Sequence, residues 1–558
     1  MRRSKLHLRR LLILLGVFVA ALFPEAEILA QPMGEGEPRA EEEWPQIALP
    51  ARQVLGPTDA PFGTLVALGV SVDLRQPSRE IVAQATLVLN PDPLPAGRPL
   101  RFYLNPGLRI EKVQAPGGGD LGFKRAGAAV DLSALPDRGS DPFVTCVLRY
   151  RGTLARHEVF APPSHAQGLL TEQLTVLAPE TLWYPWLPGQ NFTGRLRVTT
   201  PAGRAVLSCE PEERIIEWDG VRTTDFTWHT PVHRLALATT SLESAQQMRN
   251  RLVLEAAIPP AAYADRSLLF SMTLAKVDFY GRAFYPLPWD RLNLLSGPGV
   301  QTFQQGRGLV VLPADQLETH LMVTHPLLDR LLARQWFGDL LVFAPEEEAH
   351  ERGWTEFAAR LYQEELFAAK AQAQWEAEGR RLTRTWEPQA PIEVKTPWVL
   401  RMIGHWLGRP AFWELNQEFF QRHLYRQVRM EDYFAVAEDI LFEEPSGETL
   451  RRLAEPWLQD AAVPVLTYSA EVIEGTSSPR LEVHVARNSG ADWPLRLDLL
   501  IEPAGDPSAF PARREILTVE HSIETFSFPV PSSRVKVVLD PDWKVLCKRN
   551  RVKGWTSR

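Results

Sequence analysis

Residues 327–339, which read LLDRLLARQWFGD, carry the most informative pattern in this chain. Leucines recur at positions 327, 328, 331 and 332, which is the spacing of the apolar face of an amphipathic helix. Arg330 and Arg334 are one helical turn apart, so the pattern predicts that their side chains share a face of this helix.

Outward from this helix, the periodicity divides the chain into three regions. Alternating apolar runs between about 62 and 243, with frequent Pro and Gly, predict short strands. Helical periodicity dominates from about 244 to 455, and strand-like runs return after about 462. The clearest helices are expected at 354–380, 397–407 and 409–425, and the clearest late strands at 463–468, 481–485, 495–501 and 535–539.

Composition indicates an ordinary globular chain. It has 558 residues, 45 % of them hydrophobic, with 61 Lys and Arg against 68 Asp and Glu. These values exclude wholesale disorder, a coiled coil and a polytopic membrane protein, and the net charge of −7 gives no footprint for nucleic acid. Three cysteines (Cys146, Cys209 and Cys547) cannot form a disulfide framework, so we expect small buried side chains or at most one bridge.

The N-terminus has the pattern of an export signal. Basic residues precede the apolar run 11–23, which is shorter than the roughly 20 residues that span a bilayer. We expect a signal peptide at 1–30, cleavage after Ala30, a linker at 31–54, and a periplasmic or secreted mature protein. The alternative is an uncleaved N-terminal membrane anchor.

Several local motifs together resemble one known family. Trp183-Tyr184-Pro185-Trp186, Phe279-Tyr280-Gly281, the run Gln335–Asp339 and Leu539-Asp540-Pro541 follow one another as in the gluzincin aminopeptidases of the membrane alanyl aminopeptidase family, which includes leukotriene A4 hydrolase. The resemblance covers about residues 55–548. It implies a multidomain α+β fold: an N-terminal β saddle (55–243), a thermolysin-like mixed α/β peptidase domain (244–458) and a β sandwich (459–548). We expect a basic tail (549–558) to follow, without the family's large C-terminal helical domain.

The zinc motif of that family is missing here. In the family, His-Glu-x-x-His directly precedes Gln-Trp-Phe-Gly, and the two His bind zinc while the Glu acts as general base. The corresponding positions are Arg330, Leu331 and Arg334. A guanidinium has no free lone pair for a metal, and a leucine cannot transfer a proton.

Three further functional positions of the family also differ. The third zinc ligand would fall at position 353, which is Gly, or, with a two-residue insertion, at Thr355 beside Glu356. The Glu that binds the substrate amine corresponds to Gln305, and the Tyr that stabilises the oxyanion corresponds to Glu393.

The resemblance therefore implies an exported aminopeptidase homologue without catalysis, which retains the cleft for binding a peptide or protein or for scaffolding. No cofactor, no nucleic-acid partner and no membrane span after signal cleavage are expected. The alternative is an active zinc aminopeptidase with misaligned or displaced ligands, for which His320, His325 and His350 are the candidates. His405 is expected to be a hydrogen-bonded packing residue.

The two arginines lead to a further prediction. Two uncompensated guanidiniums in a buried site carry a desolvation cost of several kcal/mol each. We therefore expect Glu356 or Glu393 to pair with Arg330 or Arg334, so that an ion pair replaces the metal between helices. The alternative is that both arginines reach solvent. An arginine-lined cleft would suit an anionic peptide or a C-terminal carboxylate.

Overall fold

The computed structural model describes residues 64–75, 79–92, 99–135, 141–157, 168–171, 173–210, 212, 214–259, 266–297, 300, 304–313, 327–384, 390–443, 445–474, 479–489 and 493–552. The expected signal peptide, its cleavage site, the linker, His320 and His325 lie outside these residues. The chain divides into two compact units. The first unit contains the residues up to Asp278 and Leu287–Gln335, and the second contains Phe279–Pro286 and the residues from Trp336 onward.

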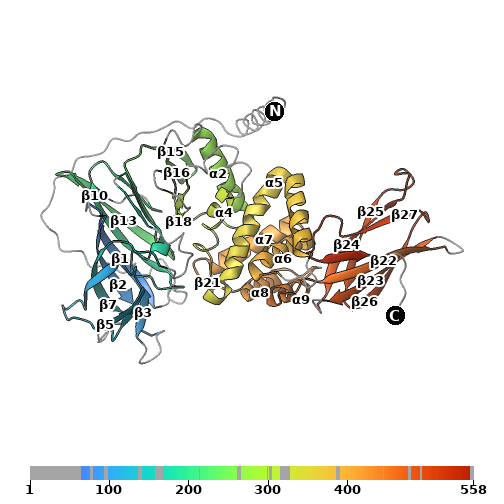
Figure 1. The fold of residues 1–558 in the computed structure, drawn as a ribbon, viewed down its shortest axis with the longest axis horizontal. Helices are drawn as coiled ribbons and strands as arrows, with labels where there is room; N and C mark the ends of the chain where they lie inside the picture. Colours follow the sequence, from blue (N-terminus) through green and yellow to red (C-terminus); the bar gives the residue numbers. More distant parts are fainter. Residues whose placement is uncertain are drawn as a thin grey trace. The chain divides into compact units, whose positions relative to one another are not determined.

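The N-terminal part of the first unit is built from a seven-stranded sheet with a smaller three-stranded sheet (Figure 1). Buried residues alternate with less buried ones along strands such as Ile81–Leu89 and Val144–Gly152, as the period of two requires, and the buried residues of these sheets form one hydrophobic core. All neighbours in the large sheet are antiparallel except β1 and β10, which are parallel. The large sheet has the order β12 (Arg214–Trp218), β13 (Val221–Val232), β10 (Phe192–Pro201), β1 (Leu65–Asp73), β2 (Ile81–Leu89), β7 (Val144–Gly152) and β4 (Leu108–Gln114), and the small sheet has the order β3 (Leu100–Tyr103), β6 (Ala129–Leu132) and β5 (Phe123–Ala126).

Two more sheets complete the first unit and share a second hydrophobic core. One has the order β11 (Ala205–Leu207), β14 (Leu237–Thr240), β9 (Leu174–Leu177) and β8 (Leu169–Leu170). The other has the order β15 (Ser244–Arg249), β16 (Leu252–Ala257), β17 (Arg291–Leu295), β19 (Leu309–Val311) and β18 (Gln304–Gly306). The helices of this unit are η1 (Pro179–Thr181), α4 (Leu327–Ala333) and α2 (Arg266–Ala283), whose last residues belong to the second unit.

The second unit combines helices with strands. Its helices are η3 (Pro345–Glu347), α5 (Glu348–Leu382), α6 (Ile392–Leu407), α7 (Arg409–His423), α8 (Met430–Ile440) and α9 (Gly447–Gln459), and the short strands β20 (Val342–Phe343) and β21 (Gln427–Val428) pair beside them. The long helix α5 is bent at Phe367, whose φ and ψ of −140° and 54° are not helical (Figure 1).

The C-terminal strands of the second unit form two antiparallel-rich sheets. The four-stranded sheet has the order β26 (Ile523–Pro529), β23 (Arg480–Ser489), β22 (Val465–Ile473) and β28 (Lys548–Arg551). The three-stranded sheet has the order β25 (Arg513–Val519), β24 (Leu495–Pro503) and β27 (Val535–Leu539). Buried residues alternate with outward-facing ones along β23 and β24, so the central part of each sheet has one apolar face. Strand β28 pairs with β22 and thereby takes the first residues of the predicted basic tail into the sheet.

The structure confirms the coarse fold class: the chain is a mixed α+β protein with seven α-helices among the described residues. The helices predicted around 327–332, 354–380, 397–407 and 409–425 are present, and so are the four late strands. The region 244–455 also contains the five-stranded sheet β15–β19, which its helical patterns do not reveal. The predicted domain boundaries stay predictions.

All three cysteines are buried and free, as the sequence allowed. Across the residues that the structure describes, no helix combines the length and the apolar character that crossing a membrane requires.

Candidate functional site

Helix α4, which ends at Ala333, and the turn directly after it carry the three positions that hold the zinc motif in the resembled family. Leu328, Leu331 and Leu332 are buried, so the position of the general base is part of the apolar core. Arg330 and Arg334 are half-buried and one helical turn apart, since the Arg334 N–H donates to the Arg330 carbonyl over 3.1 Å. The helix therefore presents cations on the face where the resemblance would place metal ligands.

A buried ion pair fixes α4 inside the first unit. Lys276 of α2 donates to the Asp329 carboxylate of α4, and both side chains are almost fully shielded from solvent. Removing either side chain would take away the buried countercharge of the other, which is costly in a region shielded from water. The sequence reasoning missed this pair. Its signal was an acidic residue on the leucine-rich side of an amphipathic helix.

Gln335 connects the end of α4 to the turn between β18 and β19. Its buried side chain donates to the Gly306 carbonyl over 3.0 Å and accepts from the Gly308 N–H over 2.7 Å. Gly308 has a φ of +65°, and a Cβ there would lie 2.7 Å from Cys209. Gln335 thus stabilises the β18–β19 hairpin at the edge of the five-stranded sheet. This hairpin carries Gln305, which corresponds to the amine-binding Glu of the resembled family.

The motif residues Trp336 and Phe337 join the segment 279–286 in the second unit. The Trp336 indole donates to the Tyr285 carbonyl over 2.6 Å, and its ring lies 5.2 Å from that of Tyr280. Phe337 meets Phe284 at 5.1 Å in an edge-to-face contact. Two of the segments that carry the family resemblance are therefore neighbours in one aromatic core.

The first possible position of the third ligand is closed by packing. A Cβ built on Gly353 of α5 would lie 2.4 Å from the Cβ of Thr396 on α6. Real Cβ atoms do not approach so closely, so a glutamate at 353 would force the two helices apart. The second possible position, Thr355, is buried and its hydroxyl donates to the Glu351 carbonyl over 2.9 Å.

The two carboxylates proposed as arginine partners have arginines within their own unit. Glu356 accepts from Arg360 over 2.8 Å, and that guanidinium also binds Glu378. Glu393 accepts from Arg352 over 3.0 Å in a half-exposed pair. Arg330 and Arg334 belong to the other unit, and the pairing predicted for them stays a prediction.

His350, a candidate ligand of the displaced metal site, is a buried residue near the start of α5. Its Nδ1 lies 2.9 Å from the Thr396 hydroxyl, which itself donates to the Ile392 carbonyl, so Nδ1 is the donor. Burial lowers the pKa of His350 to about 4, and the ring is therefore neutral at pH 7. The displaced site that would join it to His320 and His325 stays a prediction.

A cavity of about 650 Å³ lies in the second unit, between faces of α5, α6 and α7. Its apolar wall consists of Phe279, Phe357, Leu361, Ala368, Ala369, Phe412 and Trp413. The polar groups include two ion pairs, Arg401 with Glu364 at 3.2 Å and Arg409 with Glu365 at 2.8 Å. The volume is in the range of small-molecule sites, which is about 300–1,000 Å³.

His405 also lines this cavity. Burial, and then the positive charges of Arg401 and Lys544, lower its pKa to about 3. Its side chain is nevertheless accessible to solvent, as expected for a residue in a hollow of the surface. The expectation of a packing residue is therefore wrong, because His405 is exposed where it lines the cavity.

Comparison with known proteins identifies the fold. No protein-family model and no curated protein matches the sequence. The structure is similar to the crystal structure of Legionella pneumophila aminopeptidase A in complex with aspartic acid, with a TM-score of 0.71 and 14 % sequence identity. The match covers 88 % of this chain and 60 % of that chain. The protein therefore has an aminopeptidase-like fold and spans about three-fifths of the length of that aminopeptidase.

Proposed function

We propose that this protein is a noncatalytic relative of the gluzincin aminopeptidases, exported from the cytoplasm, that uses its peptidase-like fold to bind a peptide or protein. The observation that carries the proposal is α4. Its flanking residue Gln335 keeps a structural role at the β18–β19 hairpin, while Arg330, Leu331 and Arg334 occupy the positions of the metal ligands and the base. The scaffold is thus retained where the chemistry is absent.

The third ligand position supports the same proposal. At Gly353 the close approach of Thr396 leaves no room for a carboxylate, and at Thr355 the hydroxyl is engaged with the backbone of its own helix. Restoring histidines on α4 would therefore not be enough to rebuild a three-ligand zinc site.

Peptide binding does not need the metal. Among the described strands, β18 pairs only with β19, so it is an edge of the five-stranded sheet. An edge strand can hydrogen-bond to an extended peptide through its backbone. Arg330 and Arg334 would add preference for an anionic peptide or a free C-terminal carboxylate, since a guanidinium binds carboxylates through two parallel hydrogen bonds.

The first test is an aminopeptidase assay. The mature chain should not hydrolyse a panel of aminoacyl-coumarin amides, with or without added ZnCl₂, because no residue at 330, 331 or 334 can bind zinc or accept a proton. Zinc-dependent turnover that is lost in His350→Ala would contradict the proposal and favour the displaced-site enzyme.

The second test is binding. Fluorescein-labelled peptides with a free C-terminal carboxylate should bind more tightly than their amidated forms, and Arg330→Ala and Arg334→Ala should reduce that preference. Arg352→Ala is the matched control, because it removes a half-exposed arginine from α5 that pairs with Glu348 and Glu393. Equal binding of both peptide forms by all variants would contradict the role of the arginines.

A further inference from the structure

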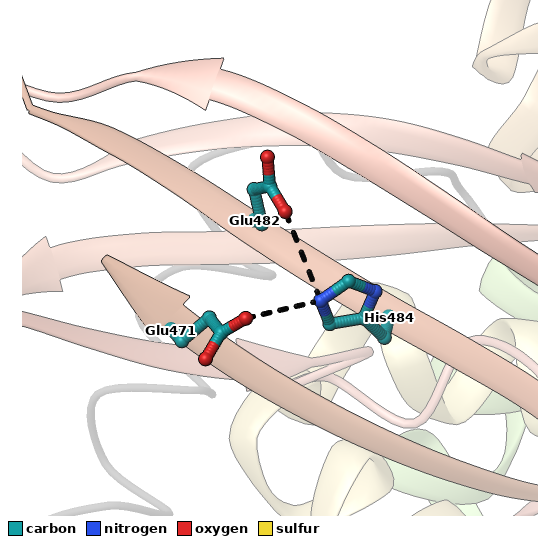
Figure 2. Close-up of side chains that lie close together, drawn as sticks. All are labelled: Glu471, Glu482 and His484. Atoms are coloured by element: carbon teal, nitrogen blue, oxygen red, sulfur yellow. Dashed lines mark hydrogen bonds and ion pairs between the residues drawn. The ribbon is translucent and has the colours of Figure 1, made fainter. Parts of the chain in front are cut away.

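Three potential metal ligands meet on the outer face of the C-terminal sheet, at Glu471, Glu482 and His484 (Figure 2). Glu471 is on β22, and the other two are on β23. The register places Glu471 directly opposite Glu482, and His484 follows two residues later on the same face. One ligand atom from each residue lies within 4.8 Å of the others.

This arrangement requires a positive charge. Like charges directly opposite one another on adjacent strands destabilise a sheet. The imidazole Nε2 lies 3.4 Å from the Glu471 carboxylate and 3.9 Å from the Glu482 carboxylate, so it faces both acids. Either a proton on this nitrogen or a metal ion between the three groups would balance the two negative charges.

The distances favour the metal. A charge-assisted hydrogen bond from an imidazolium to a carboxylate is typically about 2.7–2.9 Å long. Both distances from Nε2 are longer than this. Two ligand atoms each about 2.1 Å from a tetrahedral zinc ion are about 3.4 Å apart, which follows from the tetrahedral angle. The distance from Nε2 to the Glu471 carboxylate, 3.4 Å, already equals this ligand spacing. A small rotation of the Glu482 side chain would shorten its distance from Nε2, now 3.9 Å, to the same value.

The second imidazole nitrogen is held by a neighbouring strand. Nδ1 of His484 lies 2.8 Å from the hydroxyl of Thr525 on β26, the residue opposite His484 in the register. When Nδ1 donates this hydrogen bond, Nε2 presents its lone pair to the space between the carboxylates. Histidines that bind metals are commonly oriented in this way by a hydrogen bond from their other nitrogen.

We propose that Glu471, Glu482 and His484 form a binding site for a divalent transition metal, with zinc as the best fit. One imidazole and two carboxylates suit zinc better than Ca²⁺ or Mg²⁺, which take six or more oxygen ligands. Three protein ligands leave a fourth tetrahedral position, which faces solvent because Glu471 is 57 % exposed. A water molecule or a group from a bound partner completes the coordination there.

This site does not depend on the proposed function. It lies on β22 and β23, whereas the zinc motif of the resembled family falls on α4. Zinc bound to the purified protein would therefore not by itself indicate an active peptidase. The residues whose substitution releases the zinc distinguish the two sites.

The experiment is a zinc titration of the full mature chain after treatment with EDTA, in competition with a chromophoric chelator. We expect one zinc per chain, and at least a tenfold loss of affinity in His484→Ala, Glu471→Gln and Glu482→Gln. Thr525→Val should weaken binding by about 10- to 100-fold, the effect typical of losing an orienting partner. Excess MgCl₂ or CaCl₂ should not displace the zinc.

His521→Ala is the matched control, since it removes an exposed histidine from the same sheet region outside the cluster. It should bind zinc like the wild type. Because the three ligands lie on an outer face, the metal-free variants should keep the circular dichroism spectrum and the cooperative unfolding of the metal-free wild type, which separates loss of binding from loss of folding. Unchanged zinc affinity in His484→Ala, or a stoichiometric zinc that only His350→Ala removes, would overturn the proposal.

Discussion

Two regions of this molecule use the same kinds of side chain in opposite ways. Polar groups of α4 and, in the other unit, of α5 have protein partners: Asp329 binds Lys276, Gln335 binds Gly306 and Gly308, and His350 binds Thr396. On the outer face of β22 and β23, two carboxylates and an imidazole face a common space at distances too long for strong hydrogen bonds. The comparison teaches that the identity of a residue suggests a ligand, whereas its partners decide whether it is available as one.

The largest expected effect tests whether the α4 region is stabilised by its own ion pair. Asp329→Ala should lower the free energy of unfolding by about 3–5 kcal/mol, because it removes the carboxylate that binds the buried Lys276 ammonium group. Urea unfolding followed by circular dichroism measures this. The control Lys276→Met/Asp329→Leu removes both charges and should cost far less. A loss below about 1 kcal/mol for Asp329→Ala would mean that the Lys276–Asp329 pair contributes no more than an exposed surface ion pair.

The next effect concerns pH and tests whether His350 is committed to packing. Its pKa is lowered to about 4 by burial, whereas in the unfolded chain it is near its ordinary value of about 6.5. The unfolded state therefore takes up a proton first, and stability falls as the pH is lowered from about 6.5 to 4, by on the order of 3 kcal/mol in all. His350→Gln should flatten this part of the stability profile relative to the wild type, while His521→Gln should not. If the free energy of unfolding of His350→Gln and of the wild type changed equally with pH, the conclusion that His350 is buried and neutral would be wrong.

The smallest effect tests the contact that closes the third ligand position. Gly353→Ala should destabilise the protein by about 1–3 kcal/mol, because the new methyl group meets Thr396 across the α5–α6 interface. Gly404→Ala on α6 is the control, since its Cβ would meet only the Phe412 ring at 3.4 Å. It should be neutral, or stabilising by up to about 1 kcal/mol through its helix propensity. Thermal or urea unfolding of both variants measures the difference. Equal free energies of unfolding for Gly353→Ala and Gly404→Ala would contradict the close packing of Gly353 against Thr396.

Local patterns predicted much of the fold because they depend on neighbours in sequence. The leucine spacing around 327–332 placed α4, and the run 354–380 placed most of α5, since helical periodicity is visible within a few turns. The five-stranded sheet β15–β19 escaped notice because its strands are short, with helix α2 between them. Short apolar runs do not distinguish strands from helices.

The candidate site was predictable only in part. Arg330, Leu331 and Arg334 were found from their place before Gln335, because the spacing within one helix is set by the sequence. The Lys276–Asp329 pair and the Thr396 contact at Gly353 were missed, since each joins segments that are far apart in the chain. His405 was misjudged because the cavity that it lines is formed by the packing of α5, α6 and α7, which periodicity within one helix does not reveal.

The sequence by itself determined which chemistry α4 can offer, because a guanidinium or a leucine has the same donor and acceptor groups wherever it lies. Alternation within the predicted strand 481–485 also puts Glu482 and His484 on the same face, whereas Glu471 lies beyond the predicted strand 463–468. Only the tertiary structure decided that these three meet, because the register between β22 and β23 sets which residues are opposite. It also decided that Asp329 has a buried partner, because α2 and α4 meet only when the first unit folds.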